Sequence, residues 1–160
     1  MVKNKKKYTA VDMTFRNAVD ETPDVKNGFC YGLQALKGNT QHVNVSDSRK
    51  LDGSVDIDDC THDLYPNDSR WDYVLGYGGK AYFLEVHPAN TSNVKEMINK
   101  AKWLTCWLNE KAPLLKSIAV NNIFYWAASG KSCIIPGSTQ SRQLAQSKIQ
   151  FVGKVLHIID

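Results

Sequence analysis

The sequence lacks the features that mark a membrane protein or a disulfide-stabilised secreted domain. No apolar run approaches the roughly 18 residues of a membrane-spanning helix, and no apolar stretch follows the basic first residues as it would in a secretory signal. The four cysteines, Cys30, Cys60, Cys106 and Cys133, have no short paired spacing and indicate free thiols in a reducing compartment. We therefore expect a cytoplasmic protein without a membrane partner.

Internal repeats and flexible linkers are also missing, which predicts a single domain. The 160 residues, 42% of them hydrophobic, are enough to bury one core without disulfides or metals as staples. Residues 1–8 contain four lysines and are expected to form a basic flexible tail. The rest of the chain, residues 9–160, is expected to fold as one α/β unit.

Charge is distributed unevenly, although the net charge is only +4. Eight aspartates lie between Asp47 and Asp72 against three basic residues, whereas ten Lys or Arg and four acids lie from Tyr73 onward. An acidic segment within a basic chain is typical of a site that holds metal and attracts a polyanion. Solvated loops and a disordered lysine tail would give the same pattern, so both interpretations stay open.

Hydrophobic patterning predicts alternating helices and strands. Apolar residues at helical spacing predict a helix over residues 9–20 and another from Asn93 to Leu108, the second opened by a capping box of Asn93 and Glu96. A short helical turn is expected within residues 28–37. Branched and aromatic residues predict strands over residues 53–59, 71–77, 80–86, 118–127 and 149–159. This order indicates an α/β fold with a mixed sheet.

The predicted hairpin brings two acids together. Its turn, Gly78–Gly79, suits a two-residue connection, because both central positions of the favoured turns can need positive φ. Pairing outward from that turn sets Asp72 opposite Glu85 and Arg70 opposite His87 on one face of the sheet. Two facing carboxylates repel, and burial makes this worse unless one is protonated or a cation lies between them. A divalent cation with oxygen ligands would remove the conflict, and salt bridges to Arg70 and other basic residues would also do so.

An acid on one strand, followed by Glu-x-basic at the end of the next, resembles the PD-(D/E)XK nuclease superfamily. The resemblance covers roughly residues 9–127 and implies a restriction-endonuclease-like mixed β-sheet flanked by helices. It implies that Asp72 and Glu85 ligate a metal and that His87 stands in the place of the catalytic lysine. Glu21, or Asp20 beside it, would supply the acid that the first helix often contributes.

Metal-assisted hydrolysis of phosphodiester bonds in DNA or RNA is the activity that this resemblance implies. Asp72 and Glu85 would bind Mg²⁺ or Mn²⁺, with Asp56 or Asp58 adding a further carboxylate. His87 would place the attacking water or handle its proton. So small a nuclease would need a homodimer or another protein partner to define its nucleic-acid target.

Two departures from the superfamily pattern support other interpretations. Trp71 replaces the motif's proline, and His87 lacks the permanent charge of a lysine. The chain is therefore also consistent with a catalytically inactive nuclease-fold protein that acts in binding, immunity or regulation. A third interpretation is an unrelated α/β domain whose acids form ordinary salt bridges.

Other motifs have both functional and structural interpretations. Trp103 and Trp107 could stack on bases, but aromatic residues four apart on a helix more often pack against a sheet. Residues 129–132 resemble part of a phosphate loop without its upstream glycine, and are expected to form a turn after a strand. Lysines on the long helix either line a nucleic-acid groove or form its solvated face; they are Lys95, Lys100, Lys102 and Lys111.

His62 and its neighbours are the last candidates for a metal site. His62-Asp63 resembles the dipeptide of metal phosphohydrolases, and Cys60 with His62 could contribute to a zinc site. A zinc site needs a second close pair of ligands, which the sequence does not offer, so we expect no zinc there.

Overall fold

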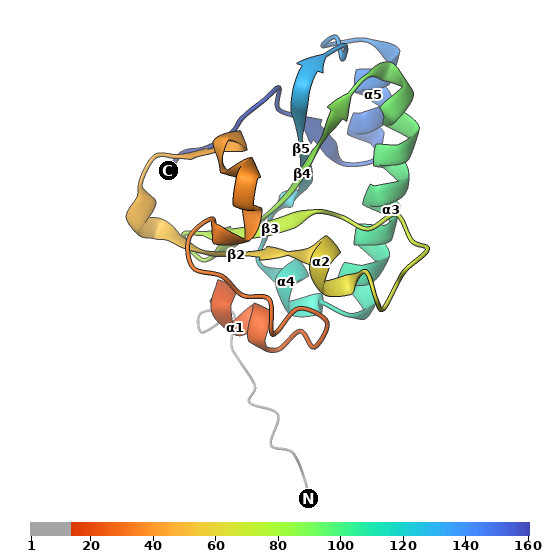
Figure 1. Cartoon of the computed structure of the whole chain (residues 1–160). Helices are drawn as coiled ribbons and strands as arrows, with labels where there is room; N and C mark the ends of the chain where they lie inside the picture. Colours follow the sequence, from red (N-terminus) through yellow and green to blue (C-terminus); the bar gives the residue numbers. More distant parts are fainter. Residues whose placement is uncertain (1–13) are drawn as a thin grey trace, which may run out of the picture.

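One mixed β-sheet forms the centre of the molecule in the computed structural model, which describes residues 14–160 (Figure 1). Its five strands lie in the order β2-β3-β4-β5-β6, so chain neighbours are also sheet neighbours. They are β2 (Leu51–Asp56), β3 (Tyr73–Tyr77), β4 (Lys80–Ala89), β5 (Ala119–Ser132) and β6 (Ile149–Phe151). The first three run antiparallel, whereas β5 and β6 run parallel to β4. The predicted α/β class with a mixed sheet is confirmed, and the predicted basic tail lies outside the described residues.

Helices and a second small sheet flank this central sheet. A parallel pair of strands, β1 (Val43–Val45) and β7 (Leu156–Ile158), lies apart from it. The long helix is α3 (Val94–Glu110), and the 3₁₀ segments are η1 (Gln34–His42), η2 (Ser48–Lys50) and η3 (Thr91–Asn93). The shorter helices are α1 (Phe15–Asp20), α2 (Ile57–Thr61), α4 (Pro113–Ser117) and α5 (Thr139–Gln146). Across residues 14–160, no helix combines the length and the apolarity that crossing a bilayer requires.

The two faces of the sheet bury different partners, because side chains alternate along each strand. One face, which includes Val74, Phe83 and Trp126, packs against α1, α3, α4 and α5. The other face, which includes Leu75 and Leu84, packs against η1 and the β1–β7 pair. Each glutamate or aspartate that shares a face with Phe83 therefore points towards the long helix α3.

The hairpin register is as the sequence predicts. Tyr73 pairs with Leu84, Leu75 with Tyr82 and Tyr77 with Lys80. Gly78 and Gly79 both have positive φ, 56° and 78°, as expected for the two central residues of this turn. The pairing continues towards Asp72 and Glu85, and this end of the hairpin holds the candidate site.

Several element boundaries differ from the sequence prediction. The strand predicted to reach residue 59 ends at Asp56, because its carboxylate accepts a hydrogen bond from Asp59 N–H (2.9 Å) and so caps α2. The capping box of Asn93 and Glu96 is wrong, since Asn93 bonds back to Asn90 N–H (3.0 Å) and Glu96 points to His87. Within the described residues, the first helix begins after Thr14, which caps it.

The C-terminal strand prediction is also wrong. Residues 149–159 form two strands in two different sheets, separated by a turn at Gly153, whose φ is 73°. The predicted helical turn within residues 28–37 is shifted to η1, which is kinked at Lys37 (φ 50°). Residues 129–132 belong to β5 and do not form a separate turn.

Candidate functional site

Asp72 and Glu85 lie side by side where the β3–β4 ladder ends. The Asp72 backbone N–H donates to Glu85 Oε2 (2.8 Å), and the Val86 N–H donates to Asp72 Oδ2 (3.1 Å). Each carboxylate thus accepts a hydrogen bond from a backbone N–H of the opposite strand. These bonds take the place of the backbone–backbone hydrogen bonds that would come next if the strand pairing continued. Glu85 is fully buried and Asp72 is partly buried. The register argument therefore predicted a real juxtaposition of two carboxylates.

The cation that this juxtaposition requires comes from α3. Lys100 Nζ hydrogen-bonds to Glu85 Oε1, and the Lys100 side chain is mostly buried. From the sequence, Lys100 was expected only on a solvated helix face or in a nucleic-acid groove. One signal was available: Lys100 lies three residues after Met97 and four before Leu104, both of them buried, so it falls on the buried stripe of the helix.

Burial controls the protonation of the three groups. Burial raises the pKa of Asp72 to about 6, against the opposing effects of the Lys100 charge and the Val86 N–H. The pKa of Glu85 is raised well above its usual range, first by burial and then by the charge of Asp72. Burial opposes the charged form of Lys100, but the charge and hydrogen bond of Glu85 outweigh it, so the pKa of Lys100 is raised. Lys100 therefore stays a cation, and burial favours the protonated form of both acids.

His87 extends the polar chain towards solvent. Its Nε2 lies 3.0 Å from Glu96 Oε2, and its Nδ1 lies 3.8 Å from Glu85 Oε1. The indole N–H of Trp126 donates to the His87 carbonyl (3.2 Å), which fixes the backbone at this position. His87 thus lies between buried Glu85 and exposed Glu96, and it hydrogen-bonds to Glu96.

The other predicted acids contribute less directly. Asp58 lies near the site, since its N–H and that of Ile57 donate to the Asp72 carbonyl (3.3 and 2.8 Å), but its carboxylate pairs with Arg70 (2.8 Å). The predicted register set Arg70 opposite His87. In the structure, Arg70 contacts Asp58 instead.

The first-helix acids and Asp56 are engaged in local structure. Glu21 forms the C-cap of α1, and among residues 14–160 no hydrogen bond or ion pair joins it to Asp72 or Glu85. Asp20 pairs with Arg16 (3.3 Å) on the surface. Asp56 caps α2, and its pKa is raised, chiefly by burial.

The donor set fits a magnesium site only if other ligands complete it. Within the described part of the chain, no group of three or more His, Cys, Asp or Glu is arranged to hold a metal ion. Mg²⁺ is commonly bound through one or two carboxylates, with waters and substrate phosphates completing the shell, and Asp72 and Glu85 supply two. Asp72 Oδ1 accepts no hydrogen bond from residues 14–160 and is not among their buried unpartnered atoms, so it keeps access to solvent.

The remaining motifs serve structural roles. Trp107 is buried and stacks on Trp103 with ring centroids 5.7 Å apart, so the packing interpretation of this pair is confirmed. Their indole N–H groups donate to Asp24 and Asp68, respectively. His62 is exposed and lies 3.1 Å from Asp63.

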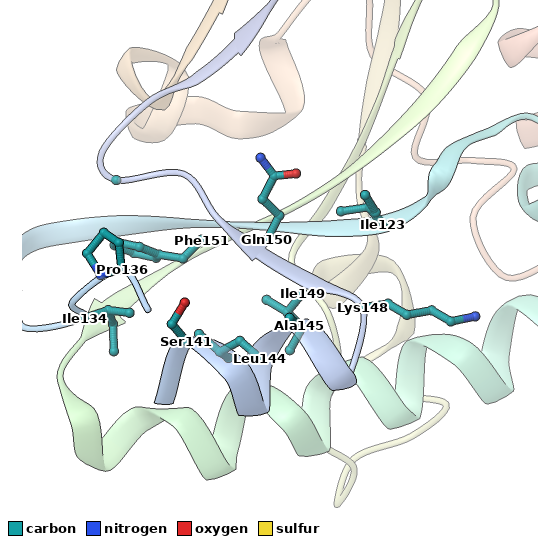
Figure 2. Close-up of a pocket in the computed structure, with 11 residues that line it drawn as sticks. Ile123, Ile134, Pro136, Ser141, Leu144, Ala145, Lys148, Ile149, Gln150 and Phe151 are labelled. Carbon is teal, nitrogen blue, oxygen red and sulfur yellow. The ribbon is translucent and has the colours of Figure 1, made fainter. Parts of the chain in front are cut away.

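A hollow of about 570 Å³ lies at the β6 edge of the sheet (Figure 2), and Asp72, Glu85 and Lys100 are not among the residues that line it. It lies between α5, β6 and the chain after β5, with apolar walls that include Ile134, Leu144, Ile149 and Phe151. Among the described residues that line it, Lys148 alone is charged. We place the candidate chemistry at Asp72 and Glu85, because catalysis of an ionic reaction needs titratable and charged groups in contact.

No protein-family model, curated protein or solved structure matches this chain. The geometry of Asp72, Glu85, Lys100 and His87 is therefore the basis for any functional interpretation.

Proposed function

We propose that this chain is a divalent-metal-dependent nuclease that hydrolyses phosphodiester bonds of DNA or RNA. The single observation that supports it best is the contact of two adjacent acids, Asp72 and Glu85, with the buried ammonium of Lys100. Placing two carboxylates together in a largely buried site is unfavourable, so such clusters are enriched where chemistry needs them. A cytoplasmic location and a homodimer or protein partner stay predictions.

Lys100 also removes one objection to catalysis. The superfamily resemblance implies a lysine where this chain has His87, and His87 is not a permanent cation. Lys100 supplies such a cation from α3, next to Glu85, where it would offset charge that develops on a scissile phosphate. His87 would then orient water or accept its proton, held in place by Glu96.

Each residue has a distinct role in this proposal. Asp72 and Glu85 would hold Mg²⁺ or Mn²⁺, Asp72 through Oδ1, which accepts no hydrogen bond from residues 14–160. The ion, when bound, supplies Lewis acidity and lowers the pKa of a coordinated water. Binding requires ionised carboxylates, so the raised pKa of Asp72 makes the affinity for metal fall as the pH drops below about 6.

The order of elements supports the restriction-endonuclease-like fold as part of the same proposal. A helix precedes the sheet, the acids lie on an antiparallel hairpin, and a further helix and a parallel strand follow. The resemblance implies this order, and the paired acids fall on the hairpin at the positions that it assigns to them.

The test is cleavage of single- and double-stranded DNA and RNA in the presence of Mn²⁺ or Mg²⁺. We expect Asp72→Asn and Lys100→Met to lower the rate at least 100-fold, and the matched exposed variant Asp63→Asn to keep it. Folding of each variant is checked by circular dichroism. Absence of cleavage of all four substrates by the wild type would overturn the proposal.

The second candidate is a non-catalytic nucleic-acid-binding or regulatory protein on the same scaffold. Lys100 favours it, because a lysine that already neutralises the acid pair makes a metal dispensable for folding. Calorimetric titration with Mg²⁺ separates the two: the nuclease requires binding that Glu85→Gln weakens, whereas the binding protein requires none.

A further inference from the structure

The side of α3 away from the acids forms one wall of a polar groove beside α5. A hollow of about 390 Å³ lies between the two helices, with Thr91 and Lys95 on one wall. The opposite wall carries Gln140, Gln143 and Gln146, three residues apart and therefore on one face of α5. This wall offers a row of amides, each able to donate and accept hydrogen bonds.

A second hollow of about 170 Å³ continues the groove along α3. Leu108 and Phe124 form its apolar part, and its polar lining consists of Thr105, Asn109, Lys116, Asn122 and Lys148. The two hollows are neighbours near the C-terminal end of α5, where Ser147 lines the first and the next residue, Lys148, lines the second. In Figure 2, α5 lies along α3 and Lys148 extends beyond the end of α5.

The groove is basic, and no aspartate or glutamate is among the described residues that line its two hollows. Lys95 and Lys148 line the hollows, and Lys102 lies between them on the same helix face, four residues after Ile98 and three before Thr105. These three lysines are exposed, and among residues 14–160 none of them forms an ion pair. Their charges are therefore available to an anionic partner.

Asn122 enters the second hollow from an unusual backbone. Asn121 and Asn122 both have left-handed φ values, 51° and 56°, which asparagine tolerates better than most residues. The pairing register between β4 and β5 shifts at this point. The irregularity places an exposed amide beside Lys148, where a regular strand would continue its ladder.

From these observations we infer that the groove binds the phosphodiester backbone of a single nucleic-acid strand, an inference that builds on the proposed nuclease function. Lysines neutralise phosphates, while glutamine and asparagine amides hydrogen-bond phosphates and base edges. Lys95 at the groove's start directly precedes Glu96, the partner of His87, so a strand that leaves the acids reaches the groove over the N-terminal end of α3. The 17-residue helix gives a track of roughly 25 Å.

The test compares two triple variants with the same loss of charge. Lys95, Lys102 and Lys148 are replaced by glutamine in the first; Lys26, Lys80 and Lys154, exposed lysines away from the groove, are replaced in the second. Both carry Asp72→Asn, so that binding is measured without cleavage. Fluorescence anisotropy with a labelled single-stranded oligonucleotide is recorded at several salt concentrations.

Removing three phosphate contacts should lower the slope of log K against log salt by about 2 and weaken binding about 100-fold at 0.1 M salt. The control variant should keep the slope and affinity of the Asp72→Asn parent. Equal losses in the two variants, or no binding of the single-stranded oligonucleotide by the parent, would overturn the inference. Binding through the groove without cleavage by the wild type would overturn the nuclease proposal alone.

Discussion

Lys100 and Lys102 are two residues apart on α3, yet their side chains lie in opposite environments. Lys100 points towards the sheet, is mostly buried and pairs with fully buried Glu85. Lys102 is exposed and has no ion-pair partner among residues 14–160. Because a helix turns 100° per residue, the first lysine stabilises a buried acid cluster, whereas the second contributes only to the field outside the molecule.

Replacing Lys100 should have the largest effect on stability. Lys100→Met leaves Glu85 buried without its cation, and breaking a buried ion pair from one side costs about 3–5 kcal/mol. Urea denaturation at pH 7 measures the change in the free energy of unfolding. The double variant Lys100→Met/Glu85→Gln should recover much of the loss, and a full loss in the double variant would show that the lysine stem, not its charge, matters.

The pH dependence of folding should reflect the acid beside Lys100. Burial raises the pKa of Asp72 from 3.8 to about 6, so the folded state binds this proton more tightly than the unfolded state. The tighter binding of this proton therefore stabilises the folded state fully below pH 4. As the pH rises towards 6, about 3 kcal/mol of this stabilisation is lost. The difference in unfolding free energy between wild type and Asp72→Asn, followed from pH 4 to 7, measures it. A difference that does not vary with pH would contradict this assignment.

The inward side of α3 is also anchored by a contact without a basic side chain, in which two neutral donors bind Asp24. Asp24 accepts hydrogen bonds from Trp107 Nε1 (3.0 Å) and Tyr65 Oη (2.7 Å). Asp24→Ala leaves the largely buried indole N–H unpaired and should cost about 1–3 kcal/mol. Thermal unfolding monitored by tryptophan fluorescence would detect this. Asp24→Asn keeps an acceptor oxygen and should lose less.

Replacing Lys102 should have the smallest effect on stability. Lys102→Met removes an exposed charge without a partner, so the free energy of unfolding should change by no more than about 0.5 kcal/mol. The same urea titration used for Lys100→Met provides the measurement. Comparable losses for Lys102→Met and Lys100→Met would mean that the two faces of α3 do not differ as described.

The sequence predicted the hairpin because its determinants are local. Two glycines at the turn and strict alternation fix which residues face each other, so Asp72 and Glu85 could be paired without a structure. Lys100 could not be paired in this way, since its contact with Glu85 depends on how α3 crosses the sheet. The sequence left both a metal and basic side chains as ways to offset the two acids, and the fold brings Lys100 to Glu85.

The C-terminal elements could not be predicted from local sequence patterns. Leu156 pairs with Val43, more than one hundred residues earlier, and no local pattern indicates such a partner. Gly153 separates β6 from β7, but a glycine in an apolar run does not reveal that the strand changes sheets. Helix α5 was missed as well, because its eight residues include only one buried apolar side chain, Leu144.

The reciprocal bonds between the acids and the strand ends make two backbone amides reporters of ionisation. The N–H groups of Asp72 and Val86 donate to the carboxylates of Glu85 and Asp72, and not to carbonyls. Protonation or ligand binding at either carboxylate therefore changes the electron density at an amide nitrogen of the opposite strand. Two NMR resonances would thus follow the charge of the cluster directly, whether or not the protein is turning over a substrate.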